Sequence, residues 1–128
     1  MNRFLHIALI GVFCLFLNTS VFGQEEGIAS FYTDALTGSR MANGDRYNPE
    51  ELTCAHPSAP MGSIIKVALK NNPDQSVMVI VTDRGPYVNG RIIDLSRKAA
   101  EKLGILTTGL SEVVVALIKK PIDPASSE

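Results

Sequence analysis

Apolar and polar residues alternate most regularly between Ser63 and Leu69, where every second residue from Ile65 is Ile, Val or Leu. A β-branched run follows over Ser76–Val81, after the turn-forming sequence Asn71-Asn72-Pro73-Asp74. Strict alternation places the apolar side chains of a strand on one face. The pattern therefore predicts a β-hairpin over residues 63–81, with its turn at residues 71–74.

Other segments have the short apolar character of strands, and one has the pattern of a helix. Ser96 is a typical N-cap, small and apolar residues follow at helical spacing, and Gly104 ends the segment, so we expect a helix over Ser96–Leu103. The polar segment Leu36–Tyr47 is expected to be a loop. The further strands expected are Gly27–Tyr32, Leu52–Ala55, Arg91–Ile93 and Val113–Ile118.

The number and size of these elements indicate an all-β fold. Six or so short strands with one helix in a single small domain are typical of a β-barrel, because closure leaves no exposed sheet edges. The pattern of strands alone does not say which barrel.

The first 23 residues have the pattern of a secretory signal. Arg3 precedes an apolar run over Phe4–Leu17, which is shorter than the roughly 18 residues of a membrane-spanning helix. Val21 and Gly23 suit cleavage before Gln24. We expect a signal peptide over residues 1–23, a barrel domain over 24–120 and a flexible tail over 121–128, with an uncleaved anchor as the alternative. The protein is then exported to the periplasm or cell envelope, without stable membrane insertion.

Composition narrows the functions further. Removing Arg3 from the 12 basic residues leaves 11, against 13 acidic residues, so nothing favours nucleic acid as a partner. Of the two cysteines only Cys54 lies after the signal segment, which excludes an internal disulfide and a zinc site of Cys and His ligands. We therefore expect no metal and no cofactor.

Two carboxylates stand where predicted strands end. Asp83 follows the hairpin and precedes an Arg-Gly-Pro turn, and Asp94 follows the next strand. Carboxylates beside arginines at strand ends suit acid–base chemistry on a sugar. Each also has a structural explanation: Asp83 can cap its turn or pair with Arg84, and Asp94 can satisfy free N–H groups at the helix start.

The other polar and aromatic candidates are individually weak. Asp45 stands beside an Asn-Gly turn, and His56 follows a short strand, where a lone histidine is usually structural. Tyr32 and Tyr87 could stack on sugar rings or fill the barrel. Cys54, within an apolar strand, is expected to be inert packing.

Taken together, these segments resemble the rare lipoprotein A (RlpA) family of double-psi β-barrels. The resemblance runs in the expected order through nearly all of the chain after the signal segment. It implies a six-stranded double-psi β-barrel with one or two short helices. The segments that carry it are Gly27–Tyr32, Met41–Tyr47, Leu52–His56, Asp83–Tyr87, Gly90–Ser96 and Ala99–Gly104.

The resemblance also implies an activity and a set of site residues. Members of this family are lytic transglycosylases, which cleave the glycan strands of peptidoglycan and leave 1,6-anhydro-muramyl ends. The implied catalytic residues are Asp83 as acid/base, with Asp45 and His56 orienting the substrate or tuning the acid. More distant double-psi barrel enzymes and the expansins have an important aspartate at the strand end that corresponds to Asp94, so Asp94 remains a rival acid. The residues expected to bind the sugar are Tyr32, Asn43, Arg84, Tyr87 and Arg91.

Two departures from the family pattern matter. Asp45 stands where the family usually has Glu, which shortens its reach by one methylene, and Cys54 stands where the family usually has Ala. The alternative function is a non-catalytic, expansin-like glycan-binding module of the cell envelope. The sequence identifies no cell-envelope protein partner.

Overall fold

The structure, a computed structural model, describes residues 23–121. The predicted signal segment, apart from Gly23, and residues 122–128 of the predicted tail lie outside the described residues. Within residues 23–121, no helix is long and apolar enough to cross a membrane. The elements are β1 (Gln24–Phe31), η1 (Asp34–Leu36), β2 (Thr53–Ala55), β3 (Ile64–Leu69), β4 (Asn72–Asp83), β5 (Arg91–Leu95), α2 (Arg97–Leu103) and β6 (Ser111–Lys119).

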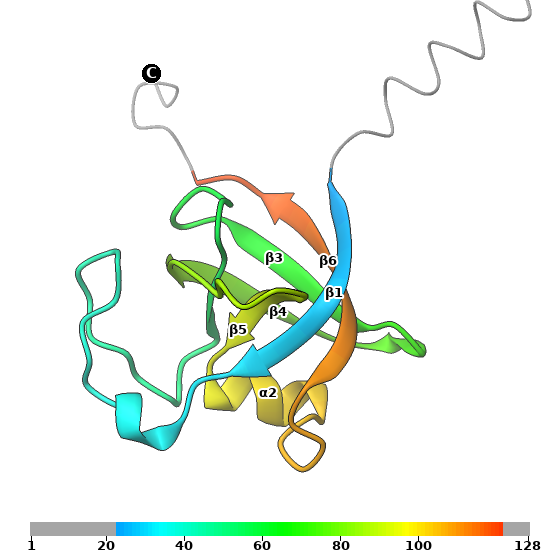
Figure 1. The fold of residues 1–128 in the computed structure, drawn as a ribbon. Coiled ribbons are helices and arrows are strands. Elements are labelled where there is room, and N and C mark those ends of the chain that lie inside the picture. Colours follow the sequence, from blue (N-terminus) through cyan, green and yellow to red (C-terminus); the bar gives the residue numbers. More distant parts are fainter. Residues whose placement is uncertain (1–22, 122–128) are drawn as a thin grey trace, which may run out of the picture.

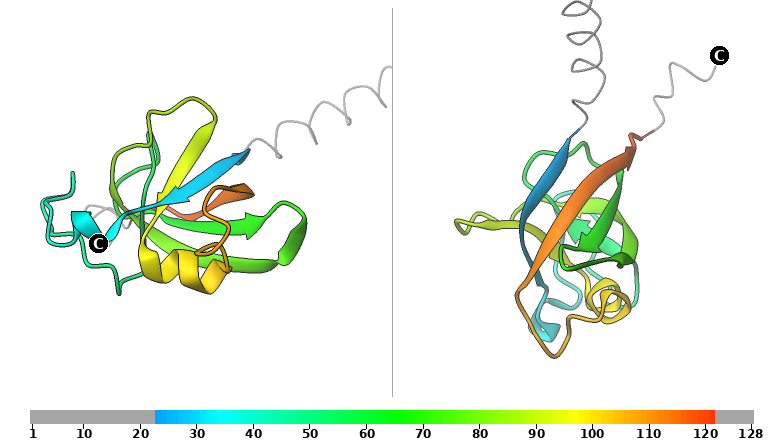
Figure 2. Two further views of the ribbon diagram at one scale, coloured as in Figure 1. Left: turned by 60° about the horizontal axis from the view of Figure 1, so that its bottom comes forward. Right: turned by 90° about the vertical axis from the view of Figure 1, so that its right-hand side faces the viewer.

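The six strands form one closed barrel (Figure 1), which confirms the predicted all-β barrel. Their order around the barrel is β1-β5-β2-β4-β3-β6. Two pairs, β1–β5 and β2–β4, are parallel, and the four others are antiparallel. β1 and β6 lie side by side in both Figure 1 and the right-hand view of Figure 2. Closure therefore joins the first and last strands of the domain.

Alternate residues of every strand fill the interior. The predicted alternation of the hairpin is observed, since the inward residues of β3 and β4 are buried while Met78 and Ile80 are each 46% exposed on the outer face. Each fully buried Ile, Leu or Val contributes roughly 1.5–3 kcal/mol of transfer free energy. The inward core residues of the strands are Ala29, Cys54, Ile65, Val67, Val77, Val79, Val81, Ile93, Leu95, Val113 and Val115.

The predicted helix is confirmed, with its predicted caps. The Ser96 hydroxyl accepts a hydrogen bond from the Ala99 N–H, and Gly104 ends the helix at φ 84°, where a side chain would be strained. Ala99, Ala100 and Leu103 are fully buried and pack α2 against the barrel below β4 (Figure 2, left). The short helix thus begins directly at the end of β5.

The hairpin turn lies earlier than predicted. β4 already begins at Asn72, which pairs with Leu69, so the reversal is a two-residue turn at Lys70 and Asn71. Pro73 is exposed near the start of β4, a position where its missing N–H is tolerated. The turn-forming composition of residues 71–74 was therefore misleading about which residues reverse the chain.

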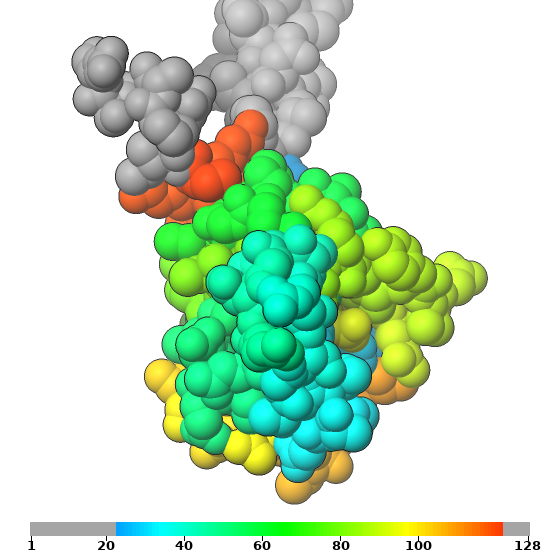
Figure 3. Space-filling model, turned by 90° about the vertical axis from the view of Figure 1, so that its left-hand side faces the viewer, coloured from blue at the N-terminus to red at the C-terminus, as the bar shows by residue number. Residues whose placement is uncertain are grey.

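A long connection between β1 and β2 lies outside the barrel. Residues 32–52 contain one short helical turn, η1, and pass across one face of the molecule, where Figure 3 shows them in cyan and teal. The connection between β4 and β5 projects beside them, in yellow-green in Figures 2 and 3. These two connections frame the face that contains the candidate site.

Candidate functional site

A cleft of about 340 Å³ lies between the outer face of the barrel and the β1–β2 connection. Its two carboxylates, Asp83 and Asp94, come from the ends of β4 and β5. The barrel side also supplies Ser30, Phe31, Tyr32 and Arg91, and the connection supplies Thr33, Leu36, Ser39, Arg40, Met41 and Tyr47.

The strand register explains why the two carboxylates share this cleft. Ala55 of β2 is the register partner of Asp83 on one side and of Asp94 on the other, and Asp94 is the partner of Ser30 in β1. The four residues thus form a row across four neighbouring strands. Neighbouring strands lie about 4.8 Å apart, so the Cα atoms of the two aspartates are roughly 10 Å apart.

The adjacent row points the other way and belongs to the core. Val81, Cys54 and Leu95 occupy the neighbouring register positions, and each is at most 1% exposed. Side chains alternate across a sheet, so burial of Leu95 turns Asp94 outward. Asp83, two residues after buried Val81, reaches the same row through the register shift that pairs Ala55 with Asp83 after Cys54 with Val81. Alternation and this irregularity together therefore determine which residues reach the cleft.

The Asp83 carboxylate is held by three hydrogen-bond donors. Its Oδ1 accepts from the backbone N–H groups of Ala42 and Arg84, both at 2.9 Å, and its Oδ2 accepts from the Tyr32 hydroxyl. The Arg84 contact is the turn cap that the sequence allowed, but the Arg84 guanidinium does not pair with Asp83. Asp83 is thus both a turn residue and a cleft residue.

Asp94 is bound by Ser30 and not by the helix. Its Oδ1 accepts a hydrogen bond from the Ser30 hydroxyl. The interpretation of Asp94 as support for the helix start is wrong, because the Ser96 hydroxyl accepts from Ala99 and β5 continues through Asp94 to Leu95. Ser30 lies in β1 and Tyr32 directly follows its last residue, so one stretch of the chain supplies a hydroxyl to each carboxylate.

Tyr32 is fixed on two sides. Its backbone N–H donates to Leu95 O at 2.9 Å, and its ring lies against Tyr47 with centroids 4.5 Å apart at 31°. Burial, reinforced by the hydrogen bond to Asp83, raises the pKa of the Tyr32 phenol well above its ordinary value. The phenol therefore stays protonated and acts as a donor.

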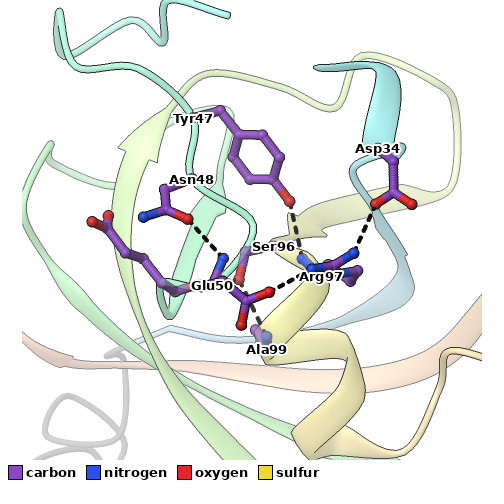
Figure 4. A network of polar contacts seen from close by, with 8 residues as sticks. Asp34, Tyr47, Asn48, Glu50, Ser96, Arg97 and Ala99 are labelled. Carbon is purple, nitrogen blue, oxygen red and sulfur yellow. Dashed lines mark hydrogen bonds and ion pairs between the residues drawn. The ribbon is translucent and has the colours of Figure 1, made fainter. Parts of the chain in front are cut away.

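The start of α2 anchors the loop wall of the cleft (Figure 4). The Arg97 N–H donates to the Tyr47 hydroxyl oxygen at 3.0 Å, and the Ser96 hydroxyl donates to Glu51 O at 2.6 Å. The Arg97 guanidinium binds Asp34 and Glu50, which lie toward opposite ends of the connection. Exposed ion pairs of this kind stabilise little, so the buried contacts of Ser96 carry most of the anchoring.

The structure places Asp45 and Asn43 beside the cleft and not in its lining. Asn43 Nδ2 donates to Asp45 Oδ2 at 3.1 Å, and the Asp45 backbone oxygen accepts from Met41 N at 2.8 Å. Asn43 N also bonds to Thr82 O at 3.1 Å, next to Asp83. This tight turn presents the Ala42 N–H to Asp83, so both residues shape a contact of the carboxylate.

His56 is buried, with both ring nitrogens occupied. Nδ1 accepts from the N–H groups of Ser58 and Ala59 at 3.1 and 2.9 Å, and Nε2 lies 2.9 Å from Glu25 Oε1. Two donors on Nδ1 assign the ring proton to Nε2, which donates to Glu25. The residue His56 is 4% exposed, and it does not line the cleft.

The remaining predicted residues are divided between the cleft and its surroundings. Arg91 lines the cleft. The Arg84 guanidinium donates to His56 O at 3.1 Å and Ala59 O at 2.7 Å, which ties the 56–59 segment to the turn after Asp83. Tyr87 is 80% exposed on the projecting β4–β5 connection.

The site residues selected from the sequence leave out eight of the cleft residues: Ser30, Phe31, Thr33, Leu36, Ser39, Arg40, Met41 and Tyr47. Ser30 could have been found, because the strand expected over Gly27–Tyr32 has a period of two, which places Ser30 on the same face as Tyr32. Arg40, Met41 and Tyr47 come from an irregular connection whose path has no periodic signal. Their place in the cleft depends on contacts with segments far along the chain.

Nothing in the described chain points to a metal. Among residues 23–121, no group of three or more His, Cys, Asp and Glu side chains could hold an ion. Burial raises the pKa of the Cys54 thiol to about 12, and the side chain is 1% exposed, which agrees with packing and not with a reactive thiolate.

Comparison with known proteins identifies a family that this chain resembles. The sequence profile of the family described as "Lytic transglycolase" matches residues 24–115. The "Endolytic peptidoglycan transglycosylase RlpA" of Campylobacter jejuni is 44% identical over 93 residues, which are 73% of this chain and 34% of that protein. The "Probable endolytic peptidoglycan transglycosylase RlpA" of Synechocystis sp. is also 44% identical over 93 residues, 73% of this chain and 29% of that protein. The chain thus spans about a third of the length of these relatives.

Two kinds of solved structure share the fold. The Streptomyces papain inhibitor superposes with a TM-score of 0.61 at 23% identity, over 77% of this chain and 98% of the inhibitor. An expansin from Clavibacter michiganensis superposes with a TM-score of 0.58 at 24% identity, over 80% of this chain and 54% of the expansin. These likenesses show the fold alone, and they confirm the double-psi β-barrel. The profile match and the relatives together show that the chain belongs to the RlpA family of lytic transglycolases.

Proposed function

We propose that this protein is a lytic transglycosylase that cleaves the glycan strands of peptidoglycan. The observation that carries the proposal is the position of Asp83, whose carboxylate lines the cleft and is held in one orientation by three donors. Membership of the RlpA family and the names of the relatives support the same activity. The predicted signal segment fits a site of action in the cell envelope.

The proposed reaction needs one acid/base group. Asp83 gives its proton to the glycosidic oxygen while the bond from that oxygen to C1 of N-acetylmuramic acid breaks. The resulting carboxylate then takes the proton of the 6-hydroxyl of the same sugar, while the 6-oxygen forms a bond to C1. The products are a 1,6-anhydromuramic end and a free 4-hydroxyl on N-acetylglucosamine, with Asp83 protonated again and no water consumed.

The other residues have supporting roles in this proposal. Asp94 lies in the same cleft, where its negative charge favours the positive charge that develops at C1, and it remains the rival acid. Arg91 lines the cleft and contacts the polar sugar. Asp45 and His56 act on the position of Asp83, Asp45 through the Ala42 turn and His56 through the segment that Arg84 holds.

The remaining predicted sugar ligands lie outside the cleft lining. We assign Asn43 to the turn that binds Asp83, as described for Asp45. Tyr87 extends the contact surface along the glycan strand, because it is exposed on the β4–β5 connection.

The test is digestion of purified peptidoglycan sacculi, followed by mass spectrometry of the soluble muropeptides. The parent protein should release products with 1,6-anhydro ends. Asp83→Asn should lower the release by at least about 10²–10⁴-fold, the usual contribution of a general acid. Asp74→Asn is the matched control, because Asp74 is an exposed aspartate at the far end of the same strand, and it should cleave like the parent.

Other product patterns would contradict the proposal in different ways. Reducing ends would indicate hydrolysis, which requires a water nucleophile. Binding to sacculi without any released product would favour the expansin-like, non-catalytic alternative. Equal cleavage by Asp83→Asn and the parent would exclude Asp83 as the acid/base.

A further inference from the structure

We propose that Tyr32 is a positioning residue for Asp83, and that its hydroxyl makes Oδ2 of Asp83 the oxygen that transfers the proton. This inference rests on the proposed transglycosylase function. It assigns to Tyr32 a role that depends on its hydroxyl and not on the face of its ring, in contrast to the sugar stacking expected from the sequence.

The two oxygens of Asp83 have different numbers of partners. A carboxylate offers about four lone-pair positions, two on each oxygen. Oδ1 accepts from the N–H groups of Ala42 and Arg84, which occupies both of its positions. Oδ2 accepts from the Tyr32 hydroxyl, which leaves one position free. Oδ2 is therefore the oxygen that can carry a proton to a sugar in the cleft.

The Tyr32 hydroxyl can hold Oδ2 because the rest of the residue is fixed. The backbone of Tyr32 is bonded to Leu95 in β5, and its ring packs at 4.5 Å on Tyr47, which α2 holds through the Arg97 N–H. A donor fixed before the reaction needs no reorganisation when charge develops on its acceptor. The carboxylate left after proton donation is thus met by a hydroxyl already in place.

Tyr32 holds the oxygen without competing for its proton. Burial and the neighbouring Asp83 and Asp94 charges raise the pKa of the phenol well above its ordinary value. The phenol therefore stays neutral while Asp83 releases and regains its proton. This separates the roles of the two residues, with Asp83 as the acid/base and Tyr32 as a fixed donor.

The neighbouring carboxylate provides an internal comparison. Among the described residues, the Asp94 side chain is bound by one donor, the Ser30 hydroxyl, against three donors on Asp83. Ser30 of β1 and Tyr32, which directly follows β1, each donate a hydroxyl hydrogen bond to one of the two carboxylates, so Ser30→Ala is the parallel change on the rival acid. If proton transfer occurs at Asp83, the loss of the Tyr32 hydroxyl should matter more.

The experiment compares the kinetics of parent, Tyr32→Phe and Ser30→Ala on soluble glycan strands, with thermal unfolding of each. Tyr32→Phe keeps the ring that packs on Tyr47 and removes only the hydroxyl. Because hydrogen bonds to charged groups are the stronger ones, we expect kcat to fall about 10- to 100-fold while KM stays within about twofold. Ser30→Ala should lower kcat less.

A stability control separates positioning from general loosening of the barrel. Ser63→Ala also removes a buried hydroxyl donor, the one bonded to Pro60 O at 2.6 Å, and Ser63 does not line the cleft. It should lower the unfolding temperature while kcat stays within about twofold of the parent value. A matching fall of kcat in Ser63→Ala and Tyr32→Phe would overturn the positioning role.

The remaining outcomes are also decisive. Unchanged kcat in Tyr32→Phe, with an active parent, overturns the inference and leaves the proposed function standing, since the ring alone then suffices. A larger fall of kcat in Ser30→Ala than in Tyr32→Phe assigns proton transfer to Asp94 and overturns it as well. A parent that releases no product refutes the proposed function, and the role of Tyr32 is refuted with it.

Discussion

Replacing Ser96 by alanine should destabilise the domain more than the loss of an ordinary surface hydroxyl. Ser96 is fully buried, and its hydroxyl makes three contacts. It caps α2 by accepting from Ala99 N at 3.2 Å, donates to Glu51 O at 2.6 Å and lies 3.4 Å from Thr53 N. One hydroxyl therefore joins the helix, β2 and the loop wall of the cleft.

The expected loss of stability in Ser96→Ala follows from these contacts. Loss of an N-cap serine costs about 1 kcal/mol, within a range of roughly 0.5–2 kcal/mol. The Glu51 carbonyl loses a short hydrogen bond, worth about 1–1.5 kcal/mol because this carbonyl belongs to an exposed residue and can bind water instead. The Thr53 contact is long and adds little. We expect a loss of about 2–3 kcal/mol, or roughly 8–15 °C in Tm for a domain of this size.

The assay is urea unfolding followed by circular dichroism, with amide hydrogen exchange of residues 47–51. Ser111→Ala is the control, because the hydrogen bond of its hydroxyl within residues 23–121 is an exposed one to Thr108 at 3.2 Å, so its effect should stay within about 0.5 kcal/mol. Exchange of the loop wall should accelerate in Ser96→Ala and stay unchanged in Ser111→Ala. An unfolding free energy within 0.5 kcal/mol of the parent value in Ser96→Ala would refute this reasoning.

Three further predictions can be checked with similar tools. Cys54→Ser should keep turnover and lose about 1–2 kcal/mol of stability, because a hydroxyl enters an apolar site. The thiol of the native protein should resist alkylation at pH 8, well below its pKa of about 12. Asp94→Asn should keep α2 intact and lose less cleavage activity than Asp83→Asn; a folded, inactive Asp94→Asn beside an active Asp83→Asn would reverse the two roles. The exported form should begin at Gln24, which leaves all of β1 in place, and N-terminal sequencing that finds Met1 in a membrane fraction would contradict this.

The parts of the fold that the sequence predicted are those with local causes. The helix was found because Ser96 and Gly104 mark its ends chemically, and the hairpin because alternation over Ser63–Leu69 requires one buried face. The turn was misplaced because Pro73 and Asp74 favour turns, yet tolerate the exposed start of a strand. Strand ends were the least accurate, since pairing with distant partners extends β1 and β6 beyond their apolar centres.

The candidate site was predictable in its carboxylates and less so in their surroundings. Asp83, Asp94, Tyr32 and Arg91 were selected from sequence and do share the cleft. His56 was selected too, but its ring is enclosed by Glu25 and two backbone N–H groups, a contact that no spacing in the sequence reveals. The hydroxyl partners of the two carboxylates lie 51 and 64 residues away along the chain, so only the barrel register brings them together.

The closure of the barrel by its last strand has a kinetic consequence. β6 is the partner of both β1 and β3, so neither of these strands has both neighbours until Ser111–Lys119 has been synthesised. Except for the β3–β4 hairpin, the strand pairs join segments far apart in sequence, and pairings of this kind make folding slow. The chain should therefore fold only after its C-terminal strand is available, and a truncation before residue 111 should prevent the cleft from forming at all.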